Sequence, residues 1–248
     1  MKVIGRRVDS VSYVSASDQI VQWVQSDESR YVCIANVHVL MEAHDSSEFR
    51  KVVNDADLVT PDGMPLVWIM RAKGLREQKR VYGPTLMLNL LQAAVREEIP
   101  VGFYGGTPDM LISLVQRVQT RYKGLNVAFC YCPPFRQLSP KEDMAVVEQI
   151  NQSGVKLLFV GLGCPKQEIW MSDHRNKVKA VMIGVGAAFA FHAGIKPQAP
   201  SWMQEMGIEW LFRLSTEPRR LWKRYLYHNP RFVVLALADL LGLLRRTD

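Results

Sequence analysis

Asp62 is the acidic residue whose position best fits a chemical role. It lies in Thr60-Pro61-Asp62-Gly63, where a short apolar run predicted to be a strand comes to an end. A carboxylate in a loop at a strand end can act as a general base that takes a proton from a hydroxyl group. Because aspartate followed by glycine is also typical of an Asx turn, residue types alone favour a structural role here.

Asp55 and Asp57 match the short D-x-D pattern that holds a divalent metal against a nucleotide diphosphate in many enzymes. The pair precedes the predicted strand, whereas Asp62 follows it. We therefore expect a helix-to-strand loop here and no metal site. Without a metal, side-chain cations must offset the charge of a departing diphosphate, and guanidinium groups pair well with phosphates. The candidates are Arg213, Arg220, Lys223 and Arg224.

Three other predicted strands end in glycine and are followed by predicted helices. In a parallel sheet such turns line the carboxyl edge, where helix N-termini offer free N–H groups to phosphate. The pattern favours a diphosphate ligand, although turn geometry alone explains any single glycine. The third glycine of a dinucleotide fingerprint is absent, so an NAD cofactor is not expected. The candidate contacts are Gly105, Gly106, Gly161, Gly163, Lys166, Gln167 and Gly186.

The histidines and cysteines show no pattern typical of a metal site. The five histidines have no paired ligand spacing, so we expect structural roles for them. The four cysteines contain no C-x-x-C pair, which favours free thiols. These residues are His38, His44, His174, His192 and His228, and Cys33, Cys130, Cys132 and Cys164.

Apolar β-rich runs alternate with amphipathic helical patterns through residues 1–200. This alternation predicts parallel βαβ units and an α/β fold, a Rossmann-like three-layer α/β/α sandwich. Strands are predicted at 32–35, 56–60, 100–104, 127–130, 156–160 and 180–183, and helices at 39–54, 84–98, 108–123 and 140–153.

Residues 201–248 form a predicted helical appendage of different composition. Aromatic residues alternate there with cations, and Glu217 is the only acid between positions 213 and 231. This mixture suits a membrane-facing helix on anionic headgroups, but it equally fits an ordinary helix with a solvated basic face. The apolar run 232–244 would span about 20 Å as a helix, too short to cross a bilayer.

The whole chain has 248 residues and a formal net charge of +7. Such a charge favours anionic partners, namely nucleic acid, phosphate-bearing substrates or acidic lipid headgroups. The basic start of the chain is not followed by the apolar segment of a signal peptide, so we expect a cytoplasmic protein.

Several segments together resemble the WecG/TagA/CpsF glycosyltransferases of bacterial cell-surface polymer synthesis. The resemblance covers nearly the whole chain and depends on the order and spacing of the segments. They are Asn36-Val37-His38, residues 57–63, Arg80-Val81-Tyr82-Gly83, residues 161–170, residues 184–194, Glu209-Trp210-Leu211-Phe212-Arg213 and Glu217-Pro218-Arg219-Arg220.

This resemblance implies an inverting, metal-independent transfer of a hexosyl or N-acetylhexosaminyl group. The implied donor is a UDP-sugar, often UDP-N-acetylmannosamine, and the implied acceptor is a sugar linked to undecaprenyl or another polyprenyl diphosphate. It also implies a peripheral location on the inner face of the plasma membrane. Within the resemblance, Asp62 matches the catalytic base. Asn36, Arg80 and Gln167 match pocket residues, and Arg213 and Arg220 match cations of the appendage.

Four residues depart from the family pattern, and we expect them to affect donor recognition. They leave open a second hypothesis, a catalytically impaired scaffold on the membrane. A nucleic-acid-binding protein is a third hypothesis, but no recognition motif accompanies the charge and no nucleic acid partner is expected. Whether the chain forms a homo-oligomer stays open. The four departures are Ile34, Thr85, Ala190 and Gln198.

Overall fold

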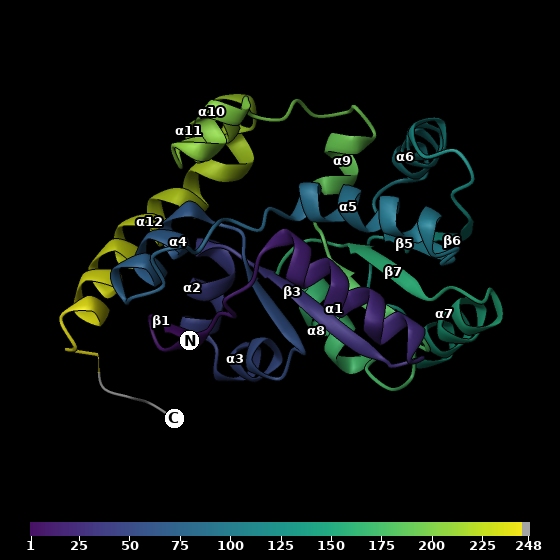
Figure 1. The fold of residues 1–248 in the computed structure, drawn as a ribbon, viewed down its shortest axis with the longest axis horizontal. Helices are drawn as coiled ribbons and strands as arrows, with labels where there is room; N and C mark the ends of the chain where they lie inside the picture. Colours follow the sequence, from purple (N-terminus) through teal and green to yellow (C-terminus); the bar gives the residue numbers. More distant parts are fainter. Residues whose placement is uncertain (245–248) are drawn as a thin grey trace.

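A six-stranded parallel sheet forms the centre of the protein, as the computed structural model of residues 1–244 shows (Figure 1). The strand order is β4-β3-β8-β7-β5-β6, and every neighbouring pair is parallel. All six predicted strands are confirmed, with ends shifted by at most two residues. They are β3 (Arg30–Ala35), β4 (Leu58–Pro61), β5 (Val101–Gly105), β6 (Val127–Tyr131), β7 (Leu157–Gly161) and β8 (Val181–Gly184).

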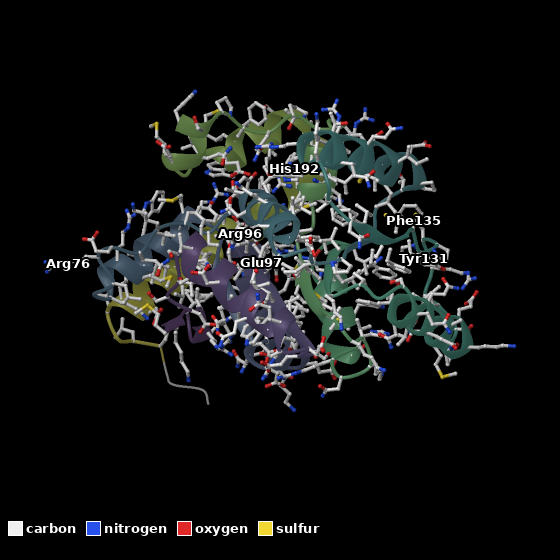
Figure 2. All side chains as sticks on the ribbon, turned by 45° about the vertical axis from the view of Figure 1, so that its right-hand side comes forward. Arg76, Arg96, Glu97, Tyr131, Phe135 and His192 are labelled. Carbon is white, nitrogen blue, oxygen red and sulfur yellow. The ribbon has the colours of Figure 1, made fainter. Side chains whose placement is uncertain are left out.

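Helices cover both faces of this sheet, because each strand buries side chains on both sides. In β3, Tyr31 and Cys33 belong to one apolar cluster, while Val32 and Ile34 belong to the other. Figure 2 shows side chains filling the space between the sheet and its helices. The predicted α/β class is therefore confirmed. One face carries α1 (Tyr13–Gln25), α5 (Gly83–Arg96), α6 (Pro108–Arg121) and α9 (Ala188–His192), and the other carries α2 (Val37–Asp45), α3 (Ser47–Asn54), α4 (Met64–Ala72), α7 (Pro140–Gln152) and α8 (Lys166–Asp173).

The prediction of one helix over residues 39–54 is wrong, because the segment forms two helices, α2 and α3. Ser46 separates them with an extended backbone (φ −120°, ψ 121°). Its hydroxyl accepts a hydrogen bond from the backbone N–H of Phe49 at 3.1 Å and so caps α3. A helical apolar pattern that continues across one capping serine cannot reveal such a break.

The C-terminal region is helical, as predicted, and comprises α10 (Ser201–Glu205), α11 (Glu209–Thr216) and α12 (Pro218–Leu240). Helix α12 runs along α2 and α4 and returns toward the N-terminal hairpin of β1 (Lys2–Val3) and β2 (Arg6–Arg7) (Figure 1). Within α12, the side chain of Phe232 is buried, and Arg231 makes a bidentate ion pair with Asp45. Asp239 accepts from the backbone N–H of Ile4 at 2.7 Å. In residues 1–244, no helix combines the length and apolarity needed to span a membrane.

Asp57 of the D-x-D pattern is used in the fold. It lies with Asp55 between α3 and β4, which confirms the predicted helix-to-strand loop. One carboxylate oxygen contacts Arg30 and Arg175, each at 2.7 Å, and the other accepts from the backbone N–H of Tyr31 at 3.0 Å. Both oxygens of the Asp57 carboxylate therefore have partners within the protein. The carboxylate lies at the edge of the sheet opposite Asp62.

We expect Asp57→Ala to lower the free energy of unfolding by about 2 to 3 kcal/mol, because two arginines each lose one of their partners and the backbone N–H of Tyr31 loses its acceptor. Both arginines keep some solvent exposure, which limits the loss. Urea denaturation would measure the effect. The control, Asp55→Ala in the same loop at an exposed position, should change stability by less than about 0.5 kcal/mol. Equal losses in the two variants would contradict a special role for Asp57.

Candidate active site

The backbone holds Asp62 at the carboxyl edge of the sheet. Its N–H donates to the carbonyl oxygen of Ala35, at the end of β3, over 2.8 Å. The N–H of Val81 donates to Pro61 at 2.9 Å and so brings the Arg80 segment alongside. The Asp62 carboxylate accepts from the guanidinium of Arg80, 3.1 Å from Nη2 and 3.3 Å from Nε. The carboxylate therefore faces another segment of the chain instead of closing its own turn.

Arg80 joins the core of the protein to the C-terminal helices. Its Nη2 lies 2.7 Å from Oε2 of Glu209, at the start of α11, and its Nε donates to the carbonyl oxygen of Asp62. The guanidinium lies over the ring of Tyr82 at 4.0 Å, and the Tyr82 hydroxyl donates to the other oxygen of Glu209 at 3.1 Å. Two carboxylates thus share one guanidinium, which fixes the position of Asp62.

The environment makes the Asp62 carboxyl a stronger base than an ordinary aspartate. Burial raises its pKa from 3.8 to about 6, the Arg80 charge opposes this shift, and the Glu209 charge adds to it. A carboxylate with a pKa near the working pH is ionised and still accepts a proton readily. Asp62 therefore has the properties that general base catalysis requires.

A cavity of about 490 Å³ lies between this edge of the sheet and the C-terminal helices. Its volume falls within the range of about 300 to 1,000 Å³ that is typical of small-molecule sites. One part of the wall is polar and the other is apolar. The polar lining includes Asn36, His38, Asp62, Arg80, Glu209, Arg213, Arg224 and His228, and the apolar lining includes Trp68, Ile69, Phe232, Val233, Leu237 and Leu240.

Arg213 and Arg224 bring two positive charges to the cavity. The Nε atoms of both side chains are buried, and neither finds a hydrogen-bond partner among the described residues. Burial lowers the pKa of Arg224, and the nearby charges of Arg213 and Arg220 act in the same direction. Two guanidinium groups with unused donors can bind an anion with several oxygen atoms, such as a diphosphate.

The structure separates the predicted site residues into two groups. Asn36, Asp62, Arg80, Arg213 and Arg224 meet at the cavity. Arg220 instead pairs with Glu217 at 2.6 Å, and Lys223 lies over the ring of Trp222 at 5.6 Å. Neither of these two cations lines the cavity, and their part in substrate binding stays a prediction.

The glycine turns lie at the ends of other strands and do not line this cavity. A Cβ atom at Gly105 would lie 2.7 Å from the Gly161 backbone, and one at Gly161 would lie 2.5 Å from the ring of Phe189. Close packing therefore requires both glycines. Gln167 is buried, where its Oε1 accepts from the N–H of Gly163 at 3.1 Å, whereas Lys166 is exposed. Ligand contacts stay predictions for Gly105, Gly106, Gly161, Gly163, Lys166, Gln167 and Gly186.

Two of the four departures from the family pattern support the Tyr82 segment. The Gln198 side chain lies close to the Tyr82 side chain. The Thr85 side chain lies close to that of Tyr13, whose hydroxyl accepts from the backbone N–H of Tyr82 at 3.0 Å. These contacts connect two of the departures to the tyrosine that supports Glu209.

The histidines divide into structural residues and one cluster. His174 makes a hydrogen bond to the carbonyl oxygen of Trp170 at 2.6 Å. His192 of α9, labelled in Figure 2, makes one to the carbonyl oxygen of Pro84 at 2.9 Å. These two have the predicted structural role. His38 and His228, by contrast, lie beside each other with ring centroids 5.2 Å apart. All four cysteines are free thiols, as predicted.

Glu209, Tyr82 and the pairing of His38 with His228 were not predicted as parts of the site. Glu209 and Tyr82 fall in segments that carry the family resemblance, but nothing local marks either side chain as functional. Glu209 lies in an aromatic-rich segment, and it is buried in the structure. A buried glutamate is almost always paired, so this acid among aromatic residues was the one signal in the sequence that pointed to a partner. The two histidines gave none, because their proximity depends on how α12 packs on α2.

Comparison with known proteins agrees with this geometry. The sequence model of the glycosyl transferase WecG/TagA/CpsF family matches residues 1–246. The chain is 28% identical over 231 residues to an N-acetylglucosaminyldiphosphoundecaprenol N-acetyl-beta-D-mannosaminyltransferase of Bacillus spizizenii, covering 93% of this chain and 87% of that protein. A protein of the same name from Bacillus subtilis is 28% identical over 209 residues, covering 84% and 79% of the two chains. The chain therefore belongs to the WecG/TagA/CpsF family and is a glycosyltransferase.

Proposed function

We propose that this glycosyltransferase moves an N-acetylmannosaminyl or related hexosaminyl group from a UDP-sugar to a sugar linked to polyprenyl diphosphate. The names of the two Bacillus relatives support this acceptor and this sugar. The observation that carries the proposal is the cavity itself, in which the Asp62 carboxylate lies near two arginines that lack carboxylate partners among the described residues.

Asp62 is the general base of the proposed reaction. It takes the proton of the acceptor hydroxyl while that oxygen forms a bond to the anomeric carbon of the donor sugar. The bond between the anomeric carbon and the diphosphate oxygen breaks on the opposite face, so the configuration inverts. Arg80 and Glu209 position the carboxylate through their shared hydrogen bonds.

Arg213 and Arg224 stabilise the leaving nucleotide diphosphate in this proposal. Their two positive charges offset the negative charge that grows as the diphosphate departs. Fixed guanidinium groups can do this without a divalent cation, so the transfer step is metal-independent. The apolar wall formed by Phe232, Leu237 and Leu240 is suited to the first part of the polyprenyl chain.

The outer surface of the C-terminal helices supports binding at a membrane surface. Large apolar side chains are exposed there beside cations, a combination that suits anionic headgroups and the adjoining acyl chains. Sedimentation with liposomes containing anionic lipid would test this part of the proposal. The exposed apolar side chains that do not line the cavity include Trp202, Trp222, Leu226, Val234 and Leu241.

An assay of UDP release and product formation tests the proposed function. The purified protein is incubated with UDP-N-acetylmannosamine and undecaprenyl-diphosphate-linked N-acetylglucosamine, with and without EDTA. We expect turnover that EDTA does not abolish. A folded protein without turnover across a panel of UDP-sugars and lipid-linked acceptors would contradict the proposal and favour the scaffold hypothesis.

We expect kcat/KM to fall about tenfold per pH unit below pH 6 and to level off above it. The base works in its ionised form. Because its pKa is raised to about 6, activity should begin to fall near pH 6 and not near the ordinary pKa of 3.8. Because the Glu209 charge raises the pKa of Asp62, Glu209→Gln should move the limb to lower pH. A pH-rate profile of both proteins measures this. A limb near pH 4 in the wild type would contradict the assignment.

A further inference from the structure

Three possible metal ligands from two helices meet beside the cavity. His38 and Glu42 are four residues apart on α2 and so share one face of that helix, while His228 reaches them from α12. Nδ1 of His38 lies 3.6 Å from Oε1 of Glu42, and Nε2 of His228 lies 3.4 Å from the same oxygen. One ligand atom from each residue falls within 4.8 Å of the other two.

These distances fit a shared cation better than direct hydrogen bonds. A hydrogen bond between an imidazole and a carboxylate is normally about 2.7 to 2.9 Å long. Ligand atoms around a tetrahedral zinc ion, bound at about 2.0 to 2.1 Å, are separated by about 3.3 to 3.5 Å. The two separations from Glu42, 3.6 Å and 3.4 Å, are close to that spacing, and the ligand atoms of the two imidazoles lie within 4.8 Å of each other.

The two rings also have unused hydrogen-bonding atoms. Within residues 1–244, Nδ1 of His38 and Nδ1 of His228 are both buried without a hydrogen-bond partner. The side chain of His228 is only 9% exposed. An unpartnered buried nitrogen is costly. For His38 it is the same atom that faces Glu42, whereas His228 faces Glu42 with its other nitrogen, Nε2.

The surroundings of the two rings add an outer contact and a positive charge. The His38 ring lies close to the backbone of Cys164, the kind of outer contact that orients a metal-binding histidine. The Arg224 guanidinium lies near both rings.

We propose that His38, Glu42 and His228 bind one Zn²⁺ or similar transition-metal ion that fastens α12 to α2. Two imidazoles and one carboxylate provide three ligands, and a water molecule completes a tetrahedral shell. The ion takes no part in the transfer step, and the site does not depend on the proposed acceptor or donor. By holding α12 in place, it keeps the C-terminal helices over the cavity.

The affinity should be moderate. Glu42 supplies one negative charge to the site, whereas the Arg224 guanidinium acts on both histidines and repels a cation. With three protein ligands and a nearby positive charge, we expect a Kd on the order of 1 µM, much weaker than that of a four-ligand structural zinc site.

Metal titration of the full chain tests the proposal. Protein stripped with EDTA and dialysed is titrated with ZnCl₂ by calorimetry, and separately with CoCl₂, whose visible absorption reports tetrahedral coordination. We expect one ion per chain and a rise in Tm of about 5 °C or more at a hundredfold excess over Kd. Hydrogen exchange in α12 should slow when Zn²⁺ is added. The absence of stoichiometric binding, or unchanged exchange in α12, would overturn the proposal.

Matched variants locate the site. Glu42→Gln and His228→Asn should each weaken Zn²⁺ binding at least tenfold, while His44→Asn, on the same helix as Glu42, should bind like the wild type. Glu42 is partly exposed, so Glu42→Gln is expected to fold even if His228→Asn does not. Circular dichroism and Tm without metal check the fold of each variant. Wild-type affinity in a folded Glu42→Gln protein would show that other side chains, such as the free thiols, bind the metal.

Discussion

Asp62→Asn is expected to lower kcat for sugar transfer by about a thousandfold, within the range that general base catalysis contributes. Asparagine has nearly the same size, and its side-chain oxygen can still accept from Arg80, but the amide does not take up a proton. Binding of the donor should change little, because the amide keeps the place of the carboxylate beside Arg80. Steady-state kinetics with varied donor and acceptor concentrations would separate kcat from KM.

Asp55→Asn is the control for this substitution, since it removes an exposed carboxylate in a loop on the opposite edge of the sheet. It should keep turnover within about twofold of the wild type. A folded Asp62→Asn protein with more than a tenth of wild-type turnover would remove Asp62 from the mechanism. The family membership and the fold would remain, and another base would have to be sought.

The double substitution Arg213→Ala and Arg224→Ala is expected to lower kcat/KM by about a thousandfold. Losing one preorganised donor to a developing charge costs about a hundredfold or more, and the two arginines act on the same leaving group. Each single variant should therefore lose about a hundredfold. Replacement of each by lysine should recover part of the activity, because lysine keeps the charge but not the two-pronged geometry. UDP release at several donor concentrations would measure these effects.

Arg219→Ala provides a charge-matched control, because Arg219 is exposed at the start of α12 and does not line the cavity. Its kcat/KM should stay within about threefold of the wild type. A similar loss in Arg219→Ala and in the single cavity variants would show that overall positive charge, and not two particular side chains, supports the reaction.

Local patterns sufficed to predict the six strands of the parallel sheet and helices α5, α6 and α7, whereas α1 and α4 were not predicted. A buried parallel strand is a short apolar run with turn residues after it, and this signal is contained within a few neighbouring positions. The break between α2 and α3 escaped prediction, because the hydrogen bond from Phe49 to Ser46 interrupts the helix without interrupting its apolar pattern. Capping depends on the backbone angles of one residue, which residue types do not fix.

The candidate site was only partly predictable. Asp62 was identified by its place at a strand end and by the family resemblance, Asn36 and Arg80 were identified by the resemblance, and all three lie at the cavity. Arg213 and Arg224 were predicted together with Arg220 and Lys223, because composition does not distinguish four cations on neighbouring turns. Helix rotation does distinguish them, since only some positions on α11 and α12 face the core.

By itself, the sequence determined that the protein is an α/β glycosyltransferase with a carboxylate at the end of its second core strand and a basic, aromatic C-terminal region. The tertiary structure decided which of these groups meet. Arg80 and Glu209 are 129 positions apart in sequence, yet they share a hydrogen bond that fixes Asp62. His38 and Glu42 meet His228 because α12 packs along α2. Such contacts depend on how the helices are placed and rotated against one another. This placement results from packing over the whole chain, so no short segment encodes it.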